Sequence, residues 1–285
     1  MTYDVMRCRS DGFFDASRDV LLPEGNGEAL NMNEPGVDLS IDGVVATVLL
    51  DRPDVRNAQH PGMWAAIAGF LDSLPAEVRV VVVRGAGGTF SAGLDLSLVD
   101  PGQTEVAGSL VATLARSDQE VIDLIGEYQR PFVALADPRF ISVAVIDGYA
   151  IGAGFQMALA CDLRIMADDA WVCMKEPALG LVPDLAGTKP LVEAVGYSRA
   201  LEICATARKV GADEAGRIGL AQSVVPAAEL DSTLADLVGS LVAHDAIAVR
   251  RTHELLAAAS SRSLDEQRLA ERTAQVGRLR AVLGR

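Results

Sequence analysis

Two glycine-rich turns are the segments of this sequence with the clearest capacity for chemistry. Residues 85–95 follow an apolar, β-branched run, and Gly152-Ala153-Gly154 follows a second such run. Their backbone N–H groups are unobstructed because the neighbouring side chains are absent or small. Two converging N–H donors form an oxyanion hole, which stabilises an enolate formed from a thioester, and one donor contributes about 2.7–4 kcal/mol. The same glycines also suit tight turns and close helix packing without any ligand, and composition alone favours that interpretation.

Other kinds of site lack their sequence signatures. Met157 stands where a dinucleotide-binding fingerprint starting at Gly152 needs its third glycine, and neither a P-loop nor a Gly-x-Ser-x-Gly elbow is present. The four cysteines and three histidines are too widely spaced for a zinc cluster or a disulfide scaffold: Cys8, Cys161, Cys173, Cys204, His60, His244 and His253. We therefore expect no metal site and no covalent nucleophile.

The hydrophobic periodicity predicts an α/β fold that positions both turns. Strands are expected at 37–41, 44–50, 78–83, 141–146, 163–166 and 171–174, and helices at 63–74, 152–161, 189–195 and 199–207. Each turn then lies at the carboxyl end of a buried strand, where α/β proteins place ligands. After Pro226 the pattern is entirely helical. We divide the chain into a loosely ordered extension at 1–36, a core at 37–228 and a helical region at 229–285.

Composition and charge restrict the classes of partner. The 285 residues are 50% hydrophobic, and 25 basic against 39 acidic side chains give a net charge of −14. This composition predicts a packed globular protein, and the acidic surface opposes binding to nucleic acid or to anionic membranes. No apolar run approaches the roughly 20 residues of a membrane helix. The N-terminus has no secretory signal pattern, so we expect a cytoplasmic protein.

Five stretches, in order, resemble the enoyl-CoA hydratase/isomerase, or crotonase, superfamily. They are Arg52–Ala58, Phe90–Asp95, Asp147–Gly154, Ala160–Arg164 and Glu176–Thr188. The resemblance implies a spiral of ββα units followed by a C-terminal helical region that builds a homotrimer or homohexamer. It also implies an acyl-CoA substrate in fatty acid metabolism, with coenzyme A as part of the substrate and no separate cofactor.

The resemblance assigns the backbone and the CoA contacts residue by residue. The oxyanion-hole donors are the N–H groups of Leu94 and Ala153, which agrees with the argument from the two turns. Arg52 and Arg56 are candidates for the CoA phosphates, although surface arginines without a ligand fit as well. The remaining substrate-contacting positions are Ala92, Gly93, Asp95, Leu96 and Gly152, although Asp95 is better suited to capping the element that begins beside it.

The acid/base positions depart from the family's hydratases, which use two glutamates to activate one water. Gln156 occupies the first position and is neutral, so it orients a group but accepts no proton. Glu176 occupies the second, between apolar neighbours that are expected to raise its pKa. Asp184 matches an aspartate of the family's dienoyl-CoA isomerases, but it also suits a turn or a helix N-cap.

This pattern leans toward double-bond isomerisation, with Glu176 as the general acid/base and hydration as the other enzymatic possibility. The alternative function is a catalytically silent acyl-CoA-binding protein of the same fold. Glu176 argues against the silent binder, because a partly buried carboxylate costs desolvation energy and gives a binder nothing in return.

Overall fold

The computed structural model describes residues 28–29, 34–99 and 110–284. Within them the strands form two sheets, a larger one in the order β1-β2-β3-β4-β5-β7-β10 and a smaller one in the order β6-β8-β9. The strands are β1 (Glu28–Ala29), β2 (Val37–Asp42), β3 (Val45–Leu50), β4 (Val80–Gly85), β5 (Ile141–Ile146), β6 (Tyr149–Ile151), β7 (Leu163–Ala167), β8 (Trp171–Cys173), β9 (Val210–Gly211) and β10 (Ser223–Val225).

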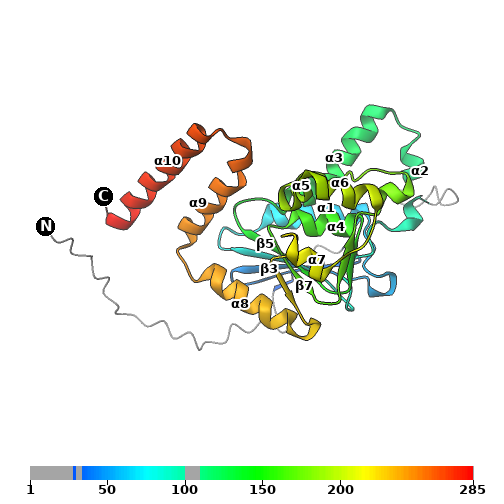
Figure 1. Ribbon diagram of the computed structural model, residues 1–285, viewed down its shortest axis with the longest axis horizontal. Helices are drawn as coiled ribbons and strands as arrows, with labels where there is room; N and C mark the ends of the chain where they lie inside the picture. Colours follow the sequence, from blue (N-terminus) through cyan, green and yellow to red (C-terminus); the bar gives the residue numbers. More distant parts are fainter. Residues whose placement is uncertain (1–27, 30–33, 100–109, 285) are drawn as a thin grey trace.

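Helices cover both sides of the larger sheet. In Figure 1, α1, α4, α5 and α6 lie above it and α8 lies below it. The helices are α1 (Pro61–Ser73), α2 (Leu110–Thr113), α3 (Asp118–Ala134), α4 (Ala153–Ala160), α5 (Thr188–Val195), α6 (Tyr197–Thr206), α7 (Ala212–Arg217), α8 (Leu230–Val242), α9 (Ala246–Ala257) and α10 (Leu264–Leu283). The predicted α/β class and the helical region after Pro226 are confirmed.

The larger sheet is parallel where it carries the glycine-rich turns. β3, β4, β5, β7 and β10 pair in parallel, with Val80 opposite Ile141 in the β4–β5 register. The four valines that begin β4 are all buried, as expected for a strand with both faces covered. Because parallel neighbours end at the same edge, the chain segments that follow β4 and β5 leave the sheet side by side. The first glycine-rich turn begins directly at the end of β4, whereas the second comes after β6, which follows β5 and belongs to the smaller sheet.

The chain rises in successive turns that alternate between the two sheets. β5 is followed by β6 and β7 by β8, and β6 pairs with β8 in parallel as β5 does with β7. The short strands β6, β9 and β10 and the helix α7 were not predicted, because segments of two to six residues seldom show a readable period. β1 was also missed: it pairs with β2 inside the segment interpreted as a loose extension, while 1–27 and 30–33 lie outside the described residues.

A buried arginine ties the end of α4 to the sheet. The Arg164 side chain donates to the carbonyls of Cys161 (2.6 Å), Ala158 (3.3 Å) and Leu220 (2.6 Å), and the residue is only 6% exposed. Burial lowers the pKa of Arg164, but these carbonyls satisfy its donors. The helix that begins at the second glycine-rich turn is therefore anchored at its far end as well.

The C-terminal helices form an arm that extends from the core (Figure 1). Two sets of contacts attach the start of this arm to the core, at the amino ends of β4, β5 and β7. Arg79 donates to the carbonyls of Leu241, Val242 and His244, where α8 ends. On α9, His253 Nε2 lies 3.0 Å from Asp162 Oδ1, and the other oxygen of Asp162 accepts from Ser142 N and Oγ.

The arm leaves much apolar surface uncovered. Among described residues α10 contains no buried side chain, and its exposed apolar residues are Leu264, Leu269, Val276, Leu279, Val282 and Leu283. No single described helix is both long and apolar enough to cross a bilayer, although the segments 227–242 and 246–261, bent by 101°, meet the length and composition test as a pair.

His253 predicts a pH dependence of stability. The hydrogen bond to Asp162 raises the pKa of His253 above its usual 6.5, against the opposing effect of burial. The stabilising contribution is therefore complete below about pH 6.5 and is lost as the pH rises through the raised pKa of the folded state. Urea unfolding of wild type is expected to show this loss, and His253→Gln to lack it. His244→Gln, at an exposed position, is the control; a loss that persists in His253→Gln contradicts the assignment.

Candidate active site

The first glycine-rich turn is fixed along β6 by its backbone. Ser91 N donates to Tyr149 O (3.0 Å), and Ser91 O accepts from Ile151 N (3.0 Å). Ala92 N then donates to Arg56 O (2.9 Å) and Asp95 N to Gln59 O (2.8 Å). Leu94 N, between these donors, has no acceptor within the described part of the chain. The turn thus reaches the second glycine-rich turn with one backbone donor free.

Two glycines place this free donor beside the start of α4. A Cβ on Gly93 would lie 3.5 Å from Ala153 N and only 2.5 Å from Ile151 O, and Gly93 has a φ of +93°. Gly152 has a φ of +51°, and a Cβ there would lie 3.2 Å from Glu176 Oε1. Ala153 is the first residue of α4, so its N–H has no partner within the helix. Leu94, Ala153 and Glu176 therefore share one small region, with glycine required at both close approaches.

Buried polar side chains hydrogen-bond to the first glycine-rich turn and hold its backbone in place. No sequence pattern assigned these side chains a role. Ser91 Oγ accepts from Gly93 N (3.1 Å) and from Gln59 Nε2 (3.0 Å) and donates to Asn57 O (2.7 Å). Gln59 Oε1 in turn accepts from Trp64 Nε1 (2.8 Å). The three polar residues are fully buried. Asn57, Gln59 and Ser91 lie in or beside the motif stretches, and this position in the sequence is the signal that could have identified them as parts of the site.

Asn57 closes the network on its other side. It has a left-handed φ of 54°, and its Nδ2 donates to Ala86 O (2.8 Å) and Thr89 O (2.6 Å). Its Oδ1 accepts from Arg52 N (2.9 Å). These bonds hold the two ends of the turn after β4 together. A buried network in which each member is satisfied rigidifies the backbone it supports.

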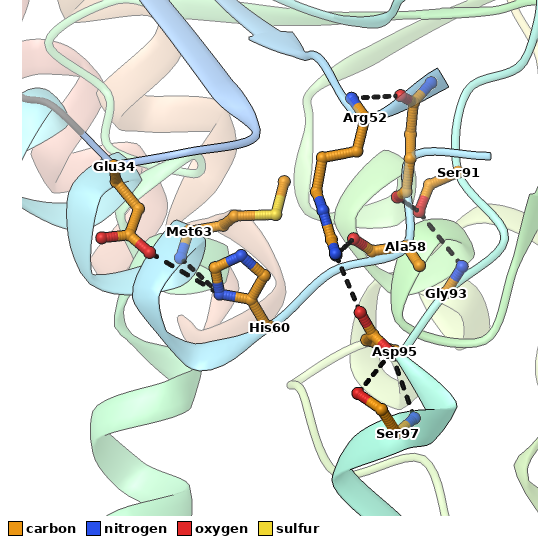
Figure 2. A network of polar contacts seen from close by, with 10 residues as sticks. Glu34, Arg52, Ala58, His60, Met63, Ser91, Gly93, Asp95 and Ser97 are labelled. Carbon is orange, nitrogen blue, oxygen red and sulfur yellow. Dashed lines mark hydrogen bonds and ion pairs between the residues drawn. The ribbon is translucent and has the colours of Figure 1, made fainter. Parts of the chain in front are cut away.

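The two arginines predicted for CoA phosphates differ in their surroundings. Figure 2 shows Arg52 directed at Asp95: Nη1 donates to Asp95 Oδ2 (2.9 Å) and to Ala58 O (2.7 Å). Asp95 also accepts from Ser97 N and Oγ, which together with Arg52 hold its pKa below its usual value despite desolvation. Arg56 is exposed, as is Leu96. Of the two arginines, Arg52 is paired with Asp95, whereas Arg56 has no ion pair among the described residues.

Glu176 carries the most unusual carboxylate of the site. It begins a short 3-10 helix after β8, and its Oε1 accepts a 2.7 Å hydrogen bond from Gln156 Nε2. Its Oε2 is buried and has no partner among the described residues. Burial raises the pKa of Glu176, the bond from Gln156 opposes that rise, and nearby Asp184 adds to it. The predicted direction of the shift is confirmed.

Asp184 lies on the loop before α5, and the N-cap interpretation is wrong. The residue that precedes α5 is Gly187. The backbone of Asp184 is held from α3, since Gln129 Nε2 donates to its carbonyl (2.6 Å). Asp184 is solvent-exposed, yet the atoms crowded around its carboxyl desolvate it enough to raise its pKa. Asp184 is therefore a second carboxylate near Glu176, close enough for its charge to raise the pKa of Glu176.

The described residues hold no group of three His, Cys, Asp or Glu side chains arranged for a metal ion. What they do bring together is two free backbone donors, one buried carboxylate with an unpaired oxygen and a second, exposed carboxylate. Converging N–H groups stabilise developing negative charge on a carbonyl oxygen, and a carboxylate with a raised pKa exchanges protons near neutral pH. The arrangement suits proton transfer next to a carbonyl.

Gly93→Ala tests the close approach of the two turns. A Cβ at this position meets the Ile151 carbonyl and requires a left-handed alanine, so we expect a loss of stability of about 1–3 kcal/mol. Urea unfolding measures the change. Gly126→Ala, in α3 with no atom within 4 Å of the added carbon, is the matched control and is expected to be neutral or stabilising. Equal stability of both variants would show that the turns are not in contact.

The chain has clear relatives of known description. The sequence profile of the family Enoyl-CoA hydratase/isomerase matches residues 40–278. Human mitochondrial Δ(3,5)-Δ(2,4)-dienoyl-CoA isomerase is 34% identical over 213 residues, which are 73% of this chain and 64% of that protein. A short-chain-enoyl-CoA hydratase of Clostridium acetobutylicum is 29% identical over 77% of this chain and 80% of its own. The β-oxidation multifunctional proteins of Brassica napus and Arabidopsis thaliana are much longer, and the match covers only 25% of the length of each.

Solved structures agree with the fold. A Thermobifida fusca YX protein assigned as an enoyl-CoA hydratase, in complex with acetoacetyl-CoA, superposes with a TM-score of 0.82 at 48% identity and covers 86% of this chain and 94% of its own. Pseudomonas aeruginosa DspI superposes with a TM-score of 0.75 at 27% identity, covering 86% and 88%. With the family profile spanning most of the core and the arm, this chain belongs to the enoyl-CoA hydratase/isomerase, or crotonase, family.

Proposed function

We propose that this protein moves a double bond along an enoyl-CoA thioester. The thioester oxygen binds the N–H groups of Leu94 and Ala153, and Glu176 removes a proton from C2. The charge is held as an enolate, and a proton returned at C4 gives the conjugated 2-enoyl-CoA from a 3-enoyl-CoA. The reaction is redox-neutral, so it requires no cofactor beyond the CoA of the substrate.

One observation carries this proposal: the unpaired, buried Oε2 of Glu176. Its other oxygen accepts from Gln156, so Oε2 is the one oxygen of this carboxylate, with its raised pKa, that has no partner among the described residues. A lone buried acceptor costs desolvation energy that a purely binding protein has no reason to retain. This disfavours the silent acyl-CoA binder.

Gln156 favours isomerisation over hydration. Adding water requires a group that takes the water's proton, and two carboxylates around one water would serve. Here Gln156 Oε1 already accepts from Leu185 N (2.9 Å) and Gly187 N (3.3 Å), so it has no lone pair left for a water. Asp184, exposed and coupled to Glu176, supplies a second proton-transfer group for longer conjugated chains, as in a dienoyl-CoA substrate.

The decisive experiment follows the absorbance of the conjugated enoyl thioester with two substrates in parallel. Gain of absorbance with 3-enoyl-CoA is expected, and loss with 2-enoyl-CoA would show hydration instead. Glu176→Gln is expected to lower kcat by about 10²–10⁴-fold, because it removes the base, while acyl-CoA binding persists. Glu77→Gln, at an exposed position, is the control. Full activity of Glu176→Gln rules out the mechanism, and inactivity of wild type with both substrates supports the silent binder.

We also propose that the protein is a homotrimer, or a homohexamer of two trimers, through its C-terminal arm. The apolar face of α10 is uncovered, and patches of this kind mark interfaces in soluble proteins. Light scattering during size-exclusion chromatography is expected to give three or six times the 30.0 kDa chain mass. Replacing Leu269 and Leu279 together by Glu is expected to reduce the mass toward that of one chain. A monomeric wild type contradicts this proposal.

A further inference from the structure

Gln156 makes three hydrogen bonds that join parts of the site far apart in sequence. Its Oε1 accepts from Leu185 N (2.9 Å) and Gly187 N (3.3 Å), and its Nε2 donates to Glu176 Oε1 (2.7 Å). The side chain is 1% exposed and projects from the first turns of α4. The amide has one possible orientation, because the reversed one would set its NH₂ against two N–H donors and its oxygen against a carboxylate.

The loop that this amide binds has a strained backbone conformation. Ala186, between the two bonded N–H groups, has a left-handed φ of +63°, which costs an alanine free energy. Gly187 packs directly on Gln156, and a Cβ there would lie 2.7 Å from Gln156 Cγ. The Gln156 oxygen therefore stabilises a strained bend two residues after Asp184, and Gln129 holds the carbonyl of Asp184 on the preceding side.

We propose that Gln156 is the positioning residue of the active site: one amide fixes the Glu176 carboxylate with its nitrogen and the Asp184 loop with its oxygen. This inference rests on the proposed proton transfer by Glu176. Its consequence is that the free oxygen of Glu176 faces the substrate in one orientation, with the second carboxylate at a fixed separation from it.

Only glutamine meets both demands in this position. A glutamate at position 156 would still accept from Leu185 N and Gly187 N. It would, however, replace the N–H donor to Glu176 by a second negative charge. Methionine has a similar length and offers neither a donor nor an adequate acceptor. Asparagine is one methylene shorter and does not span the same three partners. Substitutions at this one residue therefore separate the two roles of the amide.

The charge around Glu176 decides how these substitutions act. Among the described residues, the titratable groups that interact with Glu176 are Asp184 on the loop before α5, Cys173 on β8 and Cys204 on α6. Burial raises the pKa of both thiols, so they remain neutral at ordinary pH. Against this background a carboxylate at position 156 would be the strongest new influence on Glu176.

Two variants test the proposal. In Gln156→Glu the acid limb of the pH profile of kcat is expected to move up by about one unit, because two adjacent carboxylates resist joint ionisation. The amides of Leu185 and Gly187 keep their protection from hydrogen exchange. In Gln156→Met those two amides are expected to exchange about 3- to 10-fold faster. Its kcat is expected to fall on the order of 10²-fold, with a smaller change in KM, since misplacement of a reacting group mainly slows chemistry.

Readouts in the free enzyme separate this inference from the proposed function. Carbon-13 NMR titration of the Glu176 carboxyl and hydrogen exchange at Leu185 and Gly187 need no turnover. If wild type fails to isomerise 3-enoyl-CoA while both readouts change as expected, the proposed function fails and the positioning role stands. Unchanged exchange in Gln156→Met, or an unshifted Glu176 titration in Gln156→Glu, overturns the positioning role. Gln119→Met and Gln119→Glu, exposed on α3, control for the same chemical changes.

Discussion

β4 and β5 pair in parallel, and this pairing determines where every other part of the site is placed. Parallel neighbours end at a common edge, so the backbone segments that follow them must leave the sheet together. The segment after β5 continues as β6, and the first glycine-rich turn runs along β6 through the bonds of Ser91 with Tyr149 and Ile151. The second glycine-rich turn begins where β6 ends. Side chains contribute little at the contact itself, because Gly93 and Gly152 leave no room for them. The convergence of the Leu94 and Ala153 N–H groups is thus a property of backbone topology.

Glu176 brings a different physical problem to the same place. Burial opposes its charged form, and the nearby Asp184 does so as well. The hydrogen bond from Gln156 acts in the opposite direction and keeps one oxygen in a fixed position. The carboxylate therefore has a raised pKa without losing its orientation. An acid/base group needs both, since proton transfer depends on an intermediate pKa and on a short, directed approach.

Sequence patterns predicted the parts of this arrangement that repeat or have a period. The strands β2 to β5 and β7, the helices α1 and α4 and the α/β class follow from hydrophobic alternation, and the family follows from five ordered motifs. Contacts between residues that are far apart in the sequence could not be predicted from these patterns. No period reveals that Arg52 pairs with Asp95, that Asn57 and Gln59 support the turn, or that Gly187 rather than Asp184 precedes α5. Each depends on which segments the spiral brings together.

The attachment of the C-terminal arm has a spatial consequence. Arg79, Asp162 and Ser142 hold the arm at the amino ends of β4, β5 and β7, whereas the first glycine-rich turn and the segment that leads through β6 to the second leave the carboxyl ends of β4 and β5. A contact made by the arm therefore acts on the amino ends of these strands, and the length of the strands separates it from the glycine-rich turns. What binds to the arm and what binds at the turns occupy opposite ends of the same strands.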